Sequence, residues 1–245
     1  MDLKISWIIA SKDLKEFLRK RTVIYTVVAF PLLLSVLFPV IIDYSLRKNP
    51  GIHAAALTGV IGAFTWFYVI IPAIVPTPIA SYSIVGEKVE ESLEPLLATP
   101  ARDGEILLGK SVAAFLPAMV ATYVGAGIFM TLMDSVTYKT FGYLYFPSWS
   151  MAVVLLILAP LSAILSIELN VIASAHVNDV RSASQLGGLM FLPFMGIYLA
   201  SEIGAISLTT DNLLIIGAIV AVIDLFLFRL SVATFRREEI LTKWK

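Results

Sequence analysis

The sequence predicts an all-α, polytopic membrane protein with six transmembrane helices. Of its 245 residues 58% are hydrophobic and 15% charged, and the mean hydropathy is +0.88. An ordinary soluble domain has about 45–50% apolar and roughly 25% charged residues. The apolar residues also gather in blocks of about 20 residues or more, the length that crosses the hydrocarbon core of a bilayer. We therefore expect a single transmembrane domain over residues 1–245.

Six apolar blocks follow one another along the chain. Their expected limits are 23–42, 54–85, 111–133, 151–175, 186–206 and 213–235. The second block is the longest, yet it is too short for two spans with a turn between them. We expect one long helix there, bent or locally unwound around Pro72, Pro76 and Pro78, since transmembrane helices tolerate proline where neighbouring groups satisfy the released carbonyls.

The positive charges predict the orientation of these spans. Fifteen of the 18 Lys and Arg residues fall in segments 1–22, 86–110, 176–185 and 229–245, which six spans place on one side. The positive-inside rule puts that side, with both termini, in the cytoplasm. We expect a multi-pass protein of a prokaryotic plasma membrane. A cleaved signal peptide is not expected, because the first apolar block begins after residue 22 and is too long for one.

Residues 1–22 predict an amphipathic helix lying in the cytoplasmic interface before the first span. One helical face carries apolar side chains: Leu3, Trp7, Ala10, Leu14 and Phe17 or Leu18. The lysines of this segment lie largely off that face, a pattern typical of helices at a membrane surface.

Composition argues against several classes of function. The net charge is zero, so nothing suggests nucleic acid as a partner. The chain has no cysteine, which excludes disulfides and thiolate metal sites. His53 and His176 are far apart in sequence, and we expect no metal site, cofactor site or catalytic residue.

One motif argues for an ATPase at first sight. The stretch GEILLGKS, Gly104–Ser111, fits the phosphate-loop pattern G-x-x-x-x-G-K-[ST]. A phosphate loop needs a buried strand before it, so that backbone N–H groups point at the phosphates. Here a turn and a helix start precede Gly104, Asp103 is placed to cap that helix, and Ser111 opens the third span. We interpret the match as coincidence and predict that the chain does not hydrolyse ATP.

The segment 86–110, GEKVEESLEPLLATPARDGEILLGK, is more informative. At helical spacing Val89, Leu93 and Leu96 or Leu97 form a narrow apolar stripe. It is surrounded by four acidic residues, Glu87, Glu90, Glu91 and Glu94. A solvated acidic face does not explain the stripe, whereas a docking element for a partner protein does.

This segment resembles the signature loop of ABC-2-type transporter permeases, E-[KR]-E-x-G-[ST]-[LF]-E-x-L-L-x-[ST]-P followed by I-x-x-G-K. Matching residues are Glu87, Lys88, Ser92, Leu93, Glu94, Leu96, Leu97, Thr99, Pro100, Ile106, Gly109 and Lys110. Val89 stands at a usual Glu, and Glu91 at a usual Gly, which suggests a more regular helix. Residues 12–34 and 178–195 are similar to the family's amphipathic helix with its first span and to its second cytoplasmic loop.

The resemblance implies a transport subunit without an ATPase of its own. Two such permeases pair in the membrane, and two copies of a separate ATP-binding subunit dock beneath them. Closure of those subunits moves the cytoplasmic loops and switches the access of a cavity, in most members for export. It implies that residues 87–97 form a coupling helix whose contacts come from Glu87, Glu90, Glu91, Leu93, Glu94, Leu96 and Leu97.

Three ionisable residues lie inside the apolar blocks: Glu168, Asp224 and Arg229. Such groups cost at least ~2.5 kcal/mol near the centre of a membrane helix. They can bind a coupling ion or a polar substrate, or pair between helices. An ABC exporter needs no ion coupling, so we favour a structural role for Glu168 and Arg229 and leave Asp224 open. Similar estimated depths predict that Glu168 approaches Arg229, directly or through water.

Two other classes of function remain as alternatives. One is a stand-alone secondary transporter that uses Glu168 and Asp224 as ion carriers, although the sequence shows no internal repeat of the kind such carriers often have. The other is an intramembrane enzyme such as a lipid phosphotransferase, for which Asp179 with His176 is too small a cluster. Neither class needs the apolar stripe in 86–110. The sequence does not name the transported substrate.

Overall fold

The structure is a computed structural model that describes residues 2–19, 21–49, 54–86, 101–177 and 179–234. These residues form helices and connecting loops, with no strand among them. The elements are α1 (Leu3–Phe17), α2 (Arg21–Lys48), α3 (Ala54–Ile74), α4 (Thr77–Ser81), η1 (Tyr82–Gly86), α7 (Asp103–Phe141), α8 (Trp149–Val153), η2 (Val154–Leu158), α9 (Ala159–His176), α10 (Val180–Gly188), α11 (Phe191–Glu202) and α12 (Thr210–Thr234). Here η marks a single π-helical turn. The all-helical fold class is confirmed.

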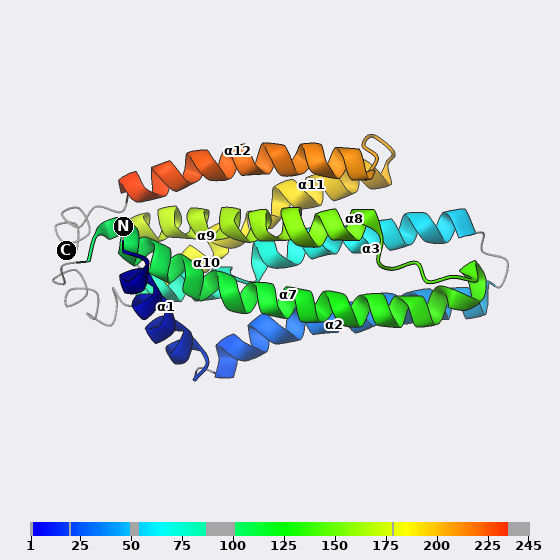
Figure 1. Ribbon diagram of the computed structural model, residues 1–245, viewed down its shortest axis with the longest axis horizontal. Helices are drawn as coiled ribbons and strands as arrows, with labels where there is room; N and C mark the ends of the chain where they lie inside the picture. The colour runs from blue at the N-terminus through cyan, green and yellow to red at the C-terminus, as the bar shows by residue number, and fades with distance from the viewer. Residues whose placement is uncertain (1, 20, 50–53, 87–100, 178, 235–245) are drawn as a thin grey trace.

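The long helices run side by side along the longest axis of the molecule (Figure 1). Within the described residues, six helical segments are long and apolar enough to cross a membrane. The chain's amino terminus and the last residues of α12 lie at the same end of the bundle, where α1 crosses obliquely (Figure 1). We refer to this as the α1 end. An even number of spans accounts for the shared location of the two ends.

The second span is broken near its prolines, as expected. Helix α3 contains Pro72 and ends at Ile74, and the chain resumes with α4 at Thr77 and the π-helical turn η1. The hydroxyl of Thr77 donates to the carbonyl oxygen of Ile74 at 2.8 Å. A side chain therefore satisfies one of the carbonyls that the break releases.

The third span is longer than the sequence predicts. Helix α7 begins at Asp103 rather than Ser111 and runs without interruption for 39 residues. At 1.5 Å per residue this is roughly 58 Å, about twice the hydrocarbon thickness. Arg102 rather than Asp103 occupies the N-cap position, and its backbone N–H donates to Glu105 Oε2 at 3.0 Å. Hydropathy marks only the apolar part of this helix, which explains the error.

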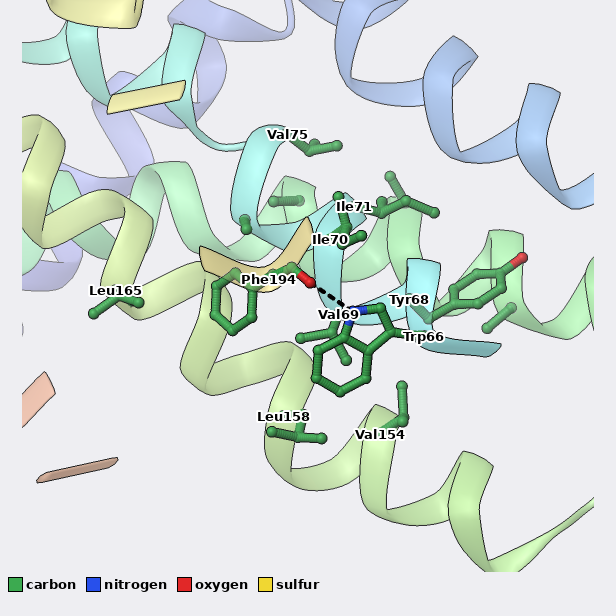
Figure 2. Packing of buried hydrophobic residues seen from close by; sticks show 14 of the residues in the cluster. Trp66, Tyr68, Val69, Ile70, Ile71, Val75, Val154, Leu158, Leu165 and Phe194 are labelled. Carbon is green, nitrogen blue, oxygen red and sulfur yellow. Dashed lines mark hydrogen bonds between the residues drawn. The ribbon is translucent and has the colours of Figure 1, made fainter. Parts of the chain in front are cut away.

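The core lies where α3 meets α9 and α11. Trp66 and Tyr68 of α3 are both almost fully buried, and the indole Nε1 of Trp66 donates to the carbonyl oxygen of Phe194 at 2.9 Å (Figure 2). On the other side of α3, the hydroxyl of Tyr68 lies 2.9 Å from Ser35 Oγ on α2. Interhelical hydrogen bonds of this kind stabilise helix packing in membranes.

Candidate functional site at the α1 end of the bundle

Helix α1 packs against the start of α7 through a face that overlaps the predicted apolar face only at Ala10 and Phe17. Its buried residues are Ser6, Ile9, Ala10, Asp13 and Phe17. Leu3 and Trp7, placed on the predicted apolar face, are 70% and 58% exposed. The predicted apolar face is therefore divided: Ala10 and Phe17 pack on the protein, whereas Leu3 and Trp7 do not. The location of α1 in the membrane interface stays a prediction.

The close packing of α1 on α7 depends on Gly109. A Cβ atom at this position would lie 2.7 Å from the carbonyl oxygen of Ser6 and 2.9 Å from Cβ of Ile9. Both distances are shorter than real side chains tolerate, so the two helices approach this closely only because residue 109 has no side chain. At Gly104, five residues earlier in α7, an added Cβ atom would meet no neighbouring atom within 4 Å.

Next to Gly109, Lys110 is buried in a three-residue polar cluster. Its Nζ donates to the carbonyl oxygen of Ser83 at 2.6 Å and lies 3.4 Å from Asp13 Oδ2. The hydroxyl of Ser83 in turn donates to the same Asp13 oxygen at 2.8 Å. Lys110, Asp13 and Ser83 are 2%, 3% and 3% exposed. A buried lysine and a buried aspartate are stable here because each neutralises and hydrogen-bonds the other.

A second set of hydrogen bonds between α1 and α7 is made by Glu105, which is 4% exposed. Its carboxylate accepts from the backbone N–H of Asp2 at 2.6 Å and from that of Arg102 at 3.0 Å. The first turn of α7 thus holds the amino terminus of α1 while fixing its own start. Charge-assisted hydrogen bonds of this type are among the stronger ones in proteins.

Together these contacts define the α1 junction, made by Asp2, Asp13, Ser83, Glu105, Gly109 and Lys110. The junction joins three elements: α1, the turn η1 that ends the second span, and the start of α7. The chain between η1 and α7 is the predicted coupling loop. Both ends of that loop are therefore fixed to α1.

The coupling residues themselves fall outside the described part of the chain. This applies to Glu87, Glu90, Glu91, Leu93, Glu94, Leu96 and Leu97. The helix expected over 87–97 and its docking stripe accordingly stay predictions.

The geometry of Gly104–Ser111 does not suit a phosphate loop. The whole stretch lies within α7, whose intrahelical hydrogen bonds already use the backbone N–H groups that would face phosphates. Lys110 Nζ is engaged by Ser83 and Asp13. Gly109 and Lys110, which match the phosphate-loop pattern, instead contribute to the packing of α1 on α7.

Helices α4, α9 and α10 are also joined by buried polar contacts and close packing. The hydroxyl of Ser81 on α4 donates to Asn170 Oδ1 on α9 at 2.7 Å, and Asn170 Nδ2 donates to the carbonyl oxygen of Ser166 at 3.0 Å. Gly187 of α10 lies so close to the Asn170 amide that a Cβ would overlap it. The second, fourth and fifth spans therefore meet at one buried amide.

The three intramembrane charges have different surroundings. Glu168 and Asp224 are each 6% exposed, whereas Arg229 is exposed. No ion pair joins Glu168 to Arg229 among the residues that the structure describes. The predicted direct pairing is therefore not formed, because Arg229 lies on an outer face of α12. Glu168 instead lies near enough to Asp224 for the two carboxyl groups to interact electrostatically.

Metal binding gains no support from the described residues. They contain no group of three or more His, Cys, Asp or Glu side chains that can hold a metal ion. At the α10 start Asp179 caps the helix, accepting from Ser182 N at 2.9 Å and from its hydroxyl at 3.0 Å. These hydrogen bonds lower the pKa of the Asp179 carboxyl, and its role is local.

Comparison with known families agrees with a membrane transport protein. The family model described as "ABC-2 family transporter protein" matches residues 7–237, nearly the whole chain. The chain belongs to this family. It is thus a membrane subunit of an ABC transporter, and an ATP-binding partner is implied for it. No curated protein matches the chain significantly.

Within this ABC-2 family protein, sequence reasoning missed Asp13. A signal was present, because Ser6, Ala10, Asp13 and Phe17 recur at helical spacing. Two small residues on that face permit close approach to another helix. The complementary glycine at position 109 was assigned only to the family motif.

Proposed function

We propose that this ABC-2 family protein is the permease subunit of an ATP-driven exporter and is coupled to its ATP-binding subunit through loop 86–110. The observation that carries the proposal is the α1 junction. Lys110, the last residue of the loop, is buried against Ser83, which lies just before the loop, and against Asp13 of α1. A partner that displaces the loop must move all three elements together.

The helices attached to the junction suit this role. Helix α7 is continuous for 39 residues, so it can carry a displacement from one end of the bundle to the other. The second span is interrupted after Ile74 and ends in the π-helical turn η1. π-turns and proline breaks recur at functional sites in helices. In our proposal α7 moves as a rigid rod while the second span changes shape at its break.

The proposed assembly contains two copies of this chain and two ATP-binding subunits. The permeases pair as a homodimer in the plasma membrane of a prokaryote, with lipid around them and both termini in the cytoplasm. The excess of Lys and Arg in segments 1–22, 86–110, 176–185 and 229–245 supports this orientation. ATP hydrolysis belongs to the partner, since the segment of this chain that matches the phosphate-loop pattern, Gly104–Ser111, is helical.

The experiment for this proposal is co-purification of the two subunits, with ATPase activity measured in lipid. Leu93→Asp should dissociate the complex or uncouple transport from hydrolysis, because it places an unpaired charge in a desolvated contact. Glu91→Gly, which restores the usual family residue, is the matched control and should be tolerated. Full assembly and transport by Leu93→Asp would show that the loop is not the coupling element.

One observation favours the alternative, a stand-alone ion-coupled transporter. Glu168 Oε2 and both carboxylate oxygens of Asp224 are buried without a hydrogen-bond partner in the structure. Transport by the reconstituted chain alone, driven by a proton or sodium gradient, would establish this alternative. Transport that requires the ATP-binding subunit and ATP would exclude it.

A further inference from the structure

A cavity of ≈ 290 Å³ lies between α7, α9 and α12, and Leu107, Leu108 and Ser111 in its wall flank Gly109 and Lys110 of the α1 junction. Most of its wall is apolar, with Val112 and Phe115 from α7, Ile164 and Ile167 from α9, and Phe228 from α12. The polar side chains that line it are Glu168, Ser111 and Ser231. The hydroxyl of Ser231 already donates to the carbonyl oxygen of Phe228 at 3.0 Å.

Glu168 is the one acidic side chain in this wall. The residue is 94% buried, and its Oε2 has no hydrogen-bond partner. A buried carboxylate oxygen without a donor costs free energy, which a ligand with N–H groups would recover. A ligand that donates to the Glu168 carboxyl group from the cavity would offset part of the cost of burying it.

Asp224 is a second buried acid near Glu168, although it is not among the residues that line the cavity. It lies four residues before Phe228 on α12, so both residues share one face of the helix. Neither of its oxygens has a hydrogen-bond partner, and it interacts electrostatically with Glu168. Two adjacent buried carboxyl groups favour a positive occupant over a neutral or negative one.

The described residues supply no internal cation for these acids. Arg229 is exposed on α12, and Lys110 is held by Asp13 and Ser83. A bare metal ion would need several more oxygen ligands than the apolar wall offers. An organic cation suits the wall better, because its apolar part can pack against Phe115 and Phe228.

We propose that this cavity binds a primary ammonium ion carrying a single apolar chain. The ammonium N–H groups donate to Glu168, the negative field of Asp224 holds the charge, and the chain lies along Val112, Phe115 and Phe228. The site needs no ATP-binding subunit, so the proposal goes beyond the proposed function and does not depend on it.

The test uses octylammonium as the probe and the purified full chain in phosphatidylcholine nanodiscs. Equilibrium binding is measured with labelled probe, and uptake by empty nanodiscs is subtracted. We expect saturable binding at one site per chain. Unlabelled octylammonium should compete, whereas octanoate, which has the same chain and a negative charge, should not.

Two variants test the residues independently. Glu168→Gln keeps the shape of the side chain and should weaken binding by about tenfold or more, because a charge-assisted hydrogen bond is lost. Val112→Trp leaves both acids in place but fills the cavity, and should abolish saturable binding. Arg229→Gln, a change outside the cavity, is the control and should bind like the wild type.

Three results would overturn the proposal: no saturable binding by the wild type, equal competition by octanoate, or unchanged binding by both cavity variants. If Glu168→Gln does not fold, Val112→Trp alone decides the matter, since it retains the carboxyl groups. Transport and ATPase activity play no part in these measurements, so failure here leaves the exporter proposal standing.

Discussion

The α1 junction and the contact between α9 and α12 both bury ionisable residues, but only those of the junction have partners for their side chains. At the junction Lys110 and Asp13 neutralise each other, and Ser83 bonds to both. Between α9 and α12, Glu168 and Asp224 are equally buried and lack hydrogen-bond partners for three of their oxygens. Buried charges that have partners hold helices in a fixed arrangement. Buried charges without partners destabilise the fold, and binding of a ligand or a proton can offset that free-energy cost.

The largest expected effect comes from breaking the partnered site. Lys110→Met leaves the carboxylate of Asp13 buried without its cation and should lower the free energy of unfolding by about 3–5 kcal/mol. The measurement is thermal or denaturant unfolding of the chain in detergent micelles. The double variant Asp13→Asn/Lys110→Met removes the uncompensated charge and should recover much of the loss. A double variant no more stable than Lys110→Met would contradict the assigned ion pair.

The next effect tests the helix contact beside that pair. Gly109→Ala should cost about 1–3 kcal/mol, because the added methyl group collides with Ser6 and Ile9 of α1. Gly104→Ala is the matched control on the same helix. It meets open space and should stabilise by about 0.5–1 kcal/mol through helix propensity. Equal behaviour of the two variants in the unfolding assay would show that α1 does not pack closely on α7.

Neutralising an acid should have opposite signs in the two regions. Asp13→Asn removes the partner of Lys110 and should destabilise the chain. Glu168→Gln removes an unpartnered buried carboxyl group and should leave the free energy of unfolding unchanged or raise it by about 1 kcal/mol. Unfolding of both variants without added amine is the measurement. Strong destabilisation by Glu168→Gln would mean that Glu168 has a structural partner within the protein.

The smallest effect belongs to an exposed ion pair on α2. Arg47 Nε lies 2.8 Å from Asp43 Oδ2, but the side chains are 77% and 40% exposed. An exposed i,i+4 pair is worth about 0.3–0.5 kcal/mol, so Arg47→Gln should change stability by no more than that. The distance is shorter than the 3.4 Å between Lys110 and Asp13. A loss as large as that of Lys110→Met would show that distance matters more than burial.

Much of the fold could be predicted from the sequence. Six blocks of apolar residues sufficed for the six spans, because the bilayer sets the length of a helix that crosses it. Pro72, Pro76 and Pro78 located the break in the second span, since proline removes a backbone donor. A helix start was expected near Asp103, but hydropathy placed the third span only from Ser111, because it does not mark residues 103–110 as part of the same continuous helix.

Only part of the candidate site could be predicted from the sequence. The motif around Gly109 and Lys110 indicated the family, and the chain belongs to it. The same motif gave no information about Asp13, which lies 97 residues before Lys110. Helical periodicity predicted one apolar face for α1, which overlaps the face that packs on the protein only at Ala10 and Phe17. In a membrane both faces can meet apolar surroundings, so hydrophobicity alone does not select between them.

The sequence by itself determined the class of this protein, the number of its spans, the break in the second span and the family to which it belongs. Each follows from local properties: the length of apolar runs, the chemistry of proline, and a short motif. Only the tertiary structure decided which buried charges have partners. Lys110 finds Asp13 and Ser83, whereas Glu168 lies near Asp224 and not beside the exposed Arg229. That outcome depends on the rotation of each helix about its axis, which is set by close packing at positions such as Gly109 and not by hydropathy.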